Sequence, residues 1–366
     1  MPLDKGQEEV DMLIAQAEQE ILNYYQRAEK ELSEKINDYW KRYKKKDKVQ
    51  KARLEAGEIT EEEYKHWRIG QLIIGKRWEE MRANIAADLT NYQNIAKNIV
   101  KEYTPDVYAA GFNYGTYSVD NAAKLDTSFT LYDRPTVERL VREKPQLLPD
   151  LNPYSKTAQE IANKKILKWH EEQIQAVAMQ GILQGESIPK IAERISGITN
   201  QDAKATIRYA RTMTTGAENA GRIDSYKRAE SMGIEMEQQW LATLDGRTRH
   251  SHRQMDGEHV PVGKKFSNGC EYPGDPKGPA GEIWCCRCTL VAMLTGIPEL
   301  DEVNDLSNTA LRYDDNLNGM SYEEWKKGHG QSRSITHQKD VGESIKQKAI
   351  NEYINAAKRL KNVEVD

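Results

Sequence analysis

Two stretches of the chain, WLATLDGRTRHSHRQMDG at residues 240–257 and WCCRCTL at residues 284–290, carry the pattern from which we predict how its second half folds. All four cysteines of the 366 residues and three of the seven histidines lie between residues 240 and 290. A chain that concentrates these side chains in one segment is expected either to coordinate a metal ion or to build a small polar site.

Short strands are expected on both sides of this segment, at residues 239–244 and 289–294, so a small sheet is added to a helical domain. Alternate side chains of a strand share one face, and Cys286 and Cys288 should therefore point the same way. Together with His252 and Cys270 they form a candidate tetrahedral zinc site. The alternative is a set of buried, reduced cysteines beside a hydrogen-bonded core histidine.

The same segment resembles the phage head morphogenesis family, which is typified by the Mu F protein and the SPP1 minor head protein. That family carries the run D-x-R-T-R-x-x-H-x-x-x-D-G and, further on, C-R-C. The matching residues are Asp245, Arg247, Thr248, Arg249, His252, Asp256, Gly257 and Cys286-Arg287-Cys288, with Pro273 in the proline-rich stretch between. Helical sequence from about Ser155 also resembles the family domain. Residues 1–150 resemble only the leader regions of minor capsid proteins, and Cys270 and Cys285 depart from the family pattern.

The resemblance implies a bacteriophage minor head protein, a low-copy structural component of the virion that lies in the capsid interior near the portal vertex. It implies that the protein binds the portal during procapsid assembly in the host cytoplasm, beside capsid and scaffold proteins, and later contacts the packaged DNA. Recognition is expected in place of catalysis, so neither an enzymatic activity nor a small-molecule substrate is predicted. A structural zinc is the one cofactor that we expect.

The composition agrees with extended helices that expose much polar surface. Charged residues make up 30% and hydrophobic residues 38% of the chain, and the mean hydropathy is -0.81. The formal charge of -4 argues against a general nucleic-acid binder. There is no signal-peptide pattern and no apolar run of about 18 residues, so no membrane partner is expected. Synthesis in a reducing cytosol favours metal binding over disulfides.

We predict a predominantly α-helical α+β protein with three regions. Pro145, Pro149 and Pro153 mark the main boundary, because proline lacks an N–H and restricts the residue before it. Residues 1–150 are expected to form an extended helical arm and residues 151–295 the head morphogenesis domain. Residues 296–366 are expected to form a tail with short helices.

Within the arm, apolar residues recur every three or four positions from Ile14 to Tyr43, which predicts a long helix that needs a partner. Gly57 interrupts this helix. Thr60 and Glu63 form a capping-box pattern that begins a second long helix, which runs to Ile99 and can pair antiparallel with the first. The pattern fits pairing within one chain and pairing between two chains equally.

Further helices are expected at residues 157–183, 188–195 and 201–232, the last of them capped by Thr199-Asn200, and in the tail from residue 321 and at residues 343–360. Pro105 suits the first turn of another helix. The stretch from Phe112 to Asp120 has no clear period and receives no assignment.

Two other functions compete with the structural one. Asp245, Asp256, Arg247 and Arg249 near His252 would be the active residues of a metal-dependent nuclease or effector-type enzyme. Their structural alternative is a capping aspartate, a turn at Asp256-Gly257 and arginines that tie the loop together. No Walker A, GxGxxG or nucleophile-elbow pattern is present.

The second competing function is that of a DNA-binding accessory protein, which would use a basic segment of the first helix to touch DNA or an acidic protein surface. The alternative is a solvated helix face. The segment contains Lys41, Arg42, Lys44, Lys45, Lys46 and Lys48, and continues to Lys51 and Arg53.

Overall fold

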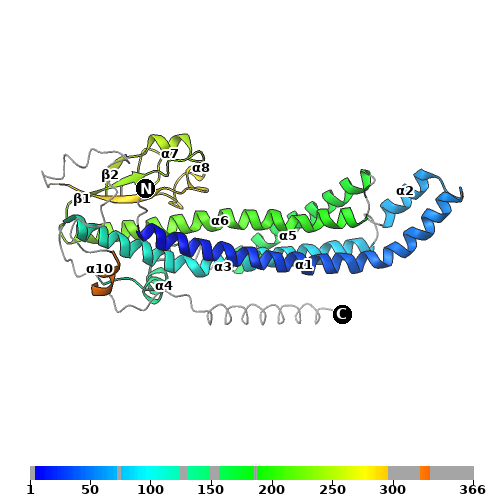
Figure 1. Ribbon diagram of the computed structural model, residues 1–366, viewed down its shortest axis with the longest axis horizontal. Helices are drawn as coiled ribbons and strands as arrows, with labels where there is room; N and C mark the ends of the chain where they lie inside the picture. Colours follow the sequence, from blue (N-terminus) through cyan, green and yellow to red (C-terminus); the bar gives the residue numbers. More distant parts are fainter. Residues whose placement is uncertain are drawn as a thin grey trace.

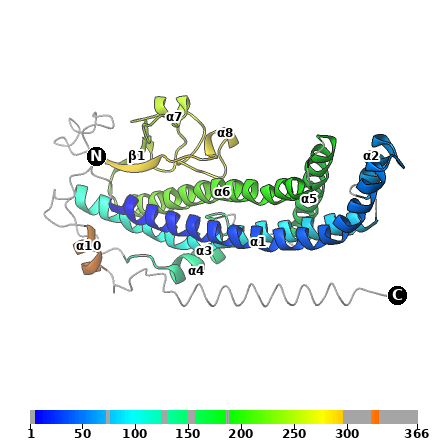
Figure 2. The same ribbon diagram turned by 45° about the vertical axis from the view of Figure 1, so that its right-hand side comes forward.

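A bundle of long helices carries a small sheet near one end and a helical hairpin at the other (Figures 1 and 2). The computed structural model describes the backbone of residues 5–71, 76–123, 130–148, 156–184, 186, 188–295 and 322–329. The long helices are α1 (Lys5–Glu55), α3 (Lys76–Ala123), α5 (Lys156–Leu183) and α6 (Ile188–Ser231). The prediction of a mainly α-helical protein with a small sheet is confirmed.

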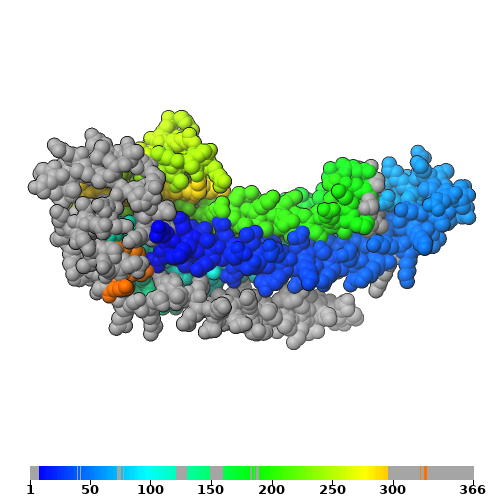
Figure 3. Space-filling model, viewed as in Figure 1, coloured from blue at the N-terminus to red at the C-terminus, as the bar shows by residue number. Residues whose placement is uncertain are grey.

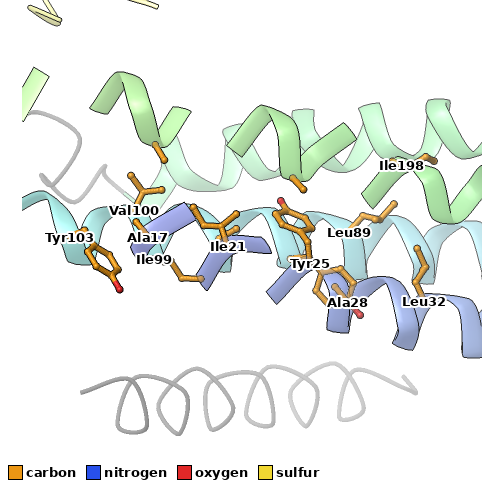
Figure 4. Close-up of a cluster of buried hydrophobic side chains, with 14 of the residues drawn as sticks. Ala17, Ile21, Tyr25, Ala28, Leu32, Leu89, Ile99, Val100, Tyr103 and Ile198 are labelled. Carbon is orange, nitrogen blue, oxygen red and sulfur yellow. The ribbon is translucent and has the colours of Figure 1, made fainter. Parts of the chain in front are cut away.

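Helix α1 forms because its apolar residues follow a spacing of three and four over ten positions. The buried residues of this stripe are Val10, Leu13, Ala17, Ile21, Tyr25, Ala28, Leu32, Ile36, Trp40 and Tyr43. Such a stripe covers one face of a helix and must be buried against a partner. Its partners are α3 and α6 of the same chain. Figure 4 shows Tyr25 of α1 beside Leu89 of α3, and Ile21 near Ile99 and Val100 of α3.

The hairpin at the far end of the bundle joins the C-terminal part of α1 to α2 (Glu61–Ile69). Gly57 adopts a positive φ of 73°, and the predicted capping box is present, since Thr60 and Glu63 bond to each other's backbone N–H. The second helix was expected to run unbroken to Ile99. The structure describes helix on both sides, in α2 and in α3, and residues 72–75 between them lie outside the described part.

Helix α3 corrects one prediction and includes a stretch that the sequence left without an assignment. Pro105 lies inside it and does not begin a new helix, and residues 112–120 are helical. The carbonyls near the proline find other donors: Val100 O accepts the Thr104 hydroxyl at 2.9 Å, and Glu102 O accepts the Arg134 guanidinium. Residues 103–120 are buried on all sides, so they show no amphipathic period from which a helix is recognised.

Helix α6 lies very close to α3. An added Cβ at Gly111 would overlap the backbone of Glu218, and one at Gly221 would overlap the backbone of Tyr108. Glycine therefore permits this crossing. The predicted break at Thr199-Asn200 is wrong, because α6 is continuous. The Thr199 hydroxyl donates to Ser196 O inside the helix, so it does not cap a new one.

The sheet has the order β2-β1-β3, with both pairings antiparallel. Strand β3 (Thr289–Leu294) has the predicted bounds, and β1 (Met236–Leu241) begins three residues earlier than expected. Strand β2 (His259–Pro261) was not predicted, because three residues are too few to show a period. The inner face of β1 buries Met236, Gln238 and Trp240.

The described residues contain four further short helices, α4 (Arg134–Glu143), α7 (His250–Gln254), α8 (Ala280–Ile283) and α10 (Tyr322–His329). The tail helix predicted from residue 321 is thus present. Tyr322 and Trp325 of α10 pack on Tyr114 and Tyr117 of α3. The helix predicted at residues 343–360 lies outside the described residues. None of the helices described is both long and apolar enough to cross a bilayer.

The boundary predicted near residue 150 falls between helices that share one core. Residues of α1 and α3, which precede it, are buried in the same hydrophobic cluster as residues of α5 and α6, which follow it. The space-filling view shows α1 and α6 lying against each other along the bundle (Figure 3). The division of the chain into an arm (residues 1–150), a domain (151–295) and a tail (296–366) stays a prediction.

Candidate functional site

Three of the four predicted ligands converge beside the sheet. His252 lies on the short helix α7 (His250–Gln254), and Cys286 and Cys288 immediately precede β3. Nδ1 of His252 is 3.7 Å from Sγ of Cys286 and 3.3 Å from Sγ of Cys288. These three residues are only 2%, 1% and 3% exposed, respectively. Across the described ranges, theirs is the group of side chains that could hold a metal ion.

The other ring nitrogen of His252 faces a carboxylate. Nε2 lies 2.9 Å from Oε2 of Glu282, within ion-pair distance, although the angle is not that of a hydrogen bond. Ser251 donates its hydroxyl to the same oxygen at 3.0 Å. A carboxylate behind the ring favours a proton on Nε2 and leaves the lone pair of Nδ1 toward the sulfur atoms.

The thiols of Cys286 and Cys288 are hydrogen-bonded to each other, and this bond shifts the pKa of both. A hydrogen bond from Cys286, and then His252, holds the pKa of Cys288 well below that of an ordinary thiol. The same bond with Cys288, followed by burial, raises the pKa of Cys286. One thiolate is therefore favoured in the pair, and a thiolate is the form that binds metal.

The structure does not place Cys270 with the other three predicted ligands. Its thiol is buried in the core of the sheet module, next to Gly278, where an added Cβ would overlap its Sγ. Burial raises the pKa of Cys270 to about 11, which is typical of a thiol that packs as a small apolar side chain. The remaining cysteine, Cys285, is exposed.

The motif aspartates and their arginines hold the loop together. Asp245 accepts two bonds of 2.6 Å from the Arg287 guanidinium, and a third of 2.8 Å from the Arg247 N–H. These bonds, Arg287 first, hold the pKa of Asp245 well below its usual range. Thr248 also bonds to Asp245. For this first half of the motif the bonds match the structural alternative, in which an aspartate and arginines tie the loop together.

The second half of the motif closes the turn that follows α7. Asp256 Oδ1 accepts the N–H of Ala242 at 2.9 Å, and Gly257 adopts a positive φ of 83°. The Arg249 guanidinium donates to the carbonyl of Trp284. Both aspartates thus hold the geometry of the loop, Asp245 through Arg287 and Asp256 through the Ala242 N–H.

A polar stripe on α6, missed in the sequence, holds the cysteine segment in place. It consists of Thr212, Thr215, Asn219, Arg222 and Tyr226. Cys285 N–H donates to the Thr212 hydroxyl at 3.0 Å, and the Thr215 hydroxyl donates to Cys286 O at 2.9 Å. The spacing of three, four, three and four is that of a helix face, but the residues are polar, so no apolar period revealed it.

Asn219 is the central member of this stripe. Its Nδ2 donates to Cys288 O at 3.2 Å, and its Oδ1 accepts the N–H of Leu290 at 2.8 Å. Arg222 donates to Leu290 O at 3.3 Å. The helix therefore satisfies backbone groups that the sheet leaves unpaired, which a buried strand requires.

The predicted basic segment lies far from this site, toward the hairpin end of α1 (Figure 1). Lys41 pairs with Asp38 at 2.6 Å. Lys44, Lys45, Lys46 and Lys48 are exposed, and the side chain of Arg42 lies outside the described part. The segment and the cysteine site are thus two separate features of one elongated molecule.

Comparisons with known proteins agree with this layout. Residues 172–291 match the family model described as Phage Mu protein F like protein, from within α5 to within β3. The minor head protein GP7 of Bacillus phage SPP1 is 25% identical over 339 residues, which are 89% of this chain and 98% of that protein. An Enterococcus faecalis protein named NAD(+)--arginine ADP-ribosyltransferase EFV is 27% identical over 241 residues, 64% of this chain and 45% of that protein. No solved structure matches the chain.

Proposed function

The chain belongs to the phage minor head protein family, and on that premise we propose that it binds the portal vertex from the capsid interior during procapsid assembly. It enters as a low-copy component beside capsid and scaffold proteins in the host cytoplasm, and it stays in the virion. The observation that carries this proposal is the extent of the match to the SPP1 protein, which covers bundle, hairpin and sheet module together.

We propose a structural role for the sheet module in place of an enzymatic one. Asp245 and Asp256, the carboxylates that a nuclease would use, are engaged by Arg287 and by the Ala242 N–H. The named activity of the enterococcal relative belongs to a protein of which less than half is matched. We infer that these charged groups hold the loop in one conformation and that the loop serves as a binding surface.

A contact with packaged DNA is the second function that an observation favours. Four exposed lysines, Lys44, Lys45, Lys46 and Lys48, lie within five residues at the hairpin end of α1. Lysines in such an array bind phosphates with a steep dependence on salt. We propose that this end of the molecule faces DNA while another surface contacts the portal.

Portal binding is tested by co-expressing the protein with the portal and scaffold of its own phage and weighing the purified portal complexes by native mass spectrometry. A complex that contains both proteins at a fixed stoichiometry is expected. If the portal assembles with scaffold but never carries the protein, the proposal is wrong.

DNA contact is tested separately by reversing the charge of the four lysines to glutamate and measuring DNA affinity over a range of salt concentrations. The control reverses three lysines that are also exposed on α5, Lys164, Lys165 and Lys168. The hairpin variant should lose affinity and flatten the salt dependence, whereas the α5 variant should keep both. Equal losses in both variants would show only a general charge effect and would refute the assignment.

A further inference from the structure

The cysteine segment poses a problem of stability. Between β1 and β3 the chain runs through 47 residues, from 242 to 288, and contains only α7, β2 and the four-residue helix α8 (Ala280–Ile283) as regular structure. Yet His252, Cys286 and Cys288 are buried among the apolar residues of this module. Polar side chains in such a place require partners.

We propose that His252, Cys286 and Cys288 bind one structural zinc ion, through Nδ1 of the imidazole and the two thiolate sulfurs. In a tetrahedral site with Zn–S of about 2.3 Å and Zn–N of about 2.0 Å, a sulfur and a nitrogen ligand lie about 3.5 Å apart. The observed distances of 3.3 and 3.7 Å lie on either side of this value. The three ligand atoms are therefore arranged as the corners of a zinc site.

The surroundings of the ligands support the same assignment. Glu282 lies 2.9 Å behind Nε2 of His252. A carboxylate in this place orients a metal-bound imidazole and increases its basicity. Two thiolates and an imidazole are soft and borderline donors that suit zinc, whereas magnesium and calcium prefer oxygen.

The ligand set differs from the sequence expectation in one residue. Cys270 is not part of the group, and among the described residues no other side chain takes the place of a fourth ligand. The described part of the chain therefore supplies three donor atoms. In known zinc sites with three protein ligands a water molecule completes the tetrahedron. Such an open fourth position is usual for catalytic zinc, whereas structural sites usually have four protein ligands. We assign the ion a structural role because all three ligands are at most 3% exposed.

The ion would join two parts of the loop that are distant in the sequence. His252 belongs to the motif helix α7, and Cys286 and Cys288 belong to the segment that the α6 stripe anchors. A bond from both to one ion fixes α7 against the long helix. It thereby orders the surface that exposes Leu244 and Trp284, which are 56% and 51% accessible.

The test is elemental analysis of the full-length protein purified without chelator, with zinc measured per chain. Wild type should contain about one zinc ion. Cys286→Ser, Cys288→Ser and His252→Ala should lose it, whereas Cys285→Ser should retain it as the matched exposed control. Cys270→Ser should also retain zinc, which separates this ligand set from the four-ligand prediction. Wild type that lacks zinc and does not take it up, or a folded Cys270→Ser variant without zinc, would overturn the proposal.

A second measurement is independent of whether the variants fold. Replacing the metal of wild type with cobalt(II) should produce intense thiolate-to-metal absorption of the strength expected for two sulfur ligands, together with the visible bands of a tetrahedral ion. Absorption without a sulfur contribution would overturn the assignment. A metal-free arrangement in which the thiols of Cys286 and Cys288 only hydrogen-bond to His252 would give neither signal, and it would overturn the proposal as well.

Discussion

Asn219→Ala tests whether the polar stripe of α6 anchors the cysteine segment. The substitution removes the donor to Cys288 O at 3.2 Å and the acceptor of the Leu290 N–H at 2.8 Å. Each buried backbone group left without a partner costs about 1–3 kcal/mol. Water can enter the space left by the amide and satisfy part of this loss, so we expect a destabilisation of about 2–4 kcal/mol in total.

The matched control is Asn200→Ala in the same helix. Asn200 is exposed, and its amide donates only to Glu29 at 3.4 Å. The two substitutions change helix propensity equally, so their difference isolates the buried bonds. The assay is thermal unfolding of wild type and both variants at one protein concentration.

Asn219→Ala should lower the melting temperature by roughly 5–15 °C, given about 2–4 °C per kcal/mol for a domain of this size, while Asn200→Ala should change it little. Hydrogen exchange should locate the loss at residues 285–290. Equal melting temperatures for the two variants, or faster exchange elsewhere only, would refute the anchoring role of the stripe.

Three other perturbations test the remaining features. Gly221→Ala should destabilise the protein by about 1–3 kcal/mol, because the added methyl group overlaps the Tyr108 backbone. Gly197→Ala, with open space around it, should stabilise the protein by about 0.5–1 kcal/mol. Chemical denaturation measures both changes, and the reverse order would mean that α3 and α6 are not this close. Limited proteolysis should cut first at residues 144–155, and because the helices share one core, the two fragments should elute together in size exclusion; fragments that separate would contradict the shared core. Arg287 lowers the pKa of Asp245, so this carboxylate stabilises the loop above its unfolded pKa of about 3.9, and this stability is lost as pH falls through its lower folded pKa. Asp245→Asn should therefore increase hydrogen exchange of the loop at neutral pH, with the difference from wild type shrinking at strongly acidic pH; a difference independent of pH would exclude the ion pair as its cause.

Local periodicity was sufficient for those parts of the fold that have one polar and one apolar face. The stripe from Ile14 to Tyr43 identified α1 because solvent covers its other side, and the capping box at Thr60 identified the start of α2 because its bonds are local. The bounds of β3 followed from its composition. The family motif likewise identified the loop that contains His252, although Asp245 and Arg249 bond to Arg287 and Trp284 in a distant part of the sequence.

The remaining features depend on what lies beside each residue in space. Residues 112–120 show no amphipathic period because α6, β3 and α10 surround this part of α3. Only the tertiary structure shows that these residues form a helix that is buried on all sides. Pro105 lies inside α3, where Arg134 of α4 donates to the nearby carbonyl of Glu102, a contact that the sequence does not show.

The composition of the candidate zinc site was decided in the same way. The sequence alone could count four cysteines in one segment, but the distance of each from His252 depends on how a loop of 47 residues is folded onto α6. The bonds of Thr215 and Asn219 to the cysteine backbone bring Cys286 and Cys288 to the imidazole, and the packing of Cys270 beside Gly278 keeps it in the apolar core. Residue types therefore determined that a thiol and imidazole site was possible, and tertiary contacts decided which thiols belong to it, because ligand geometry depends on distances between segments that sequence spacing does not specify.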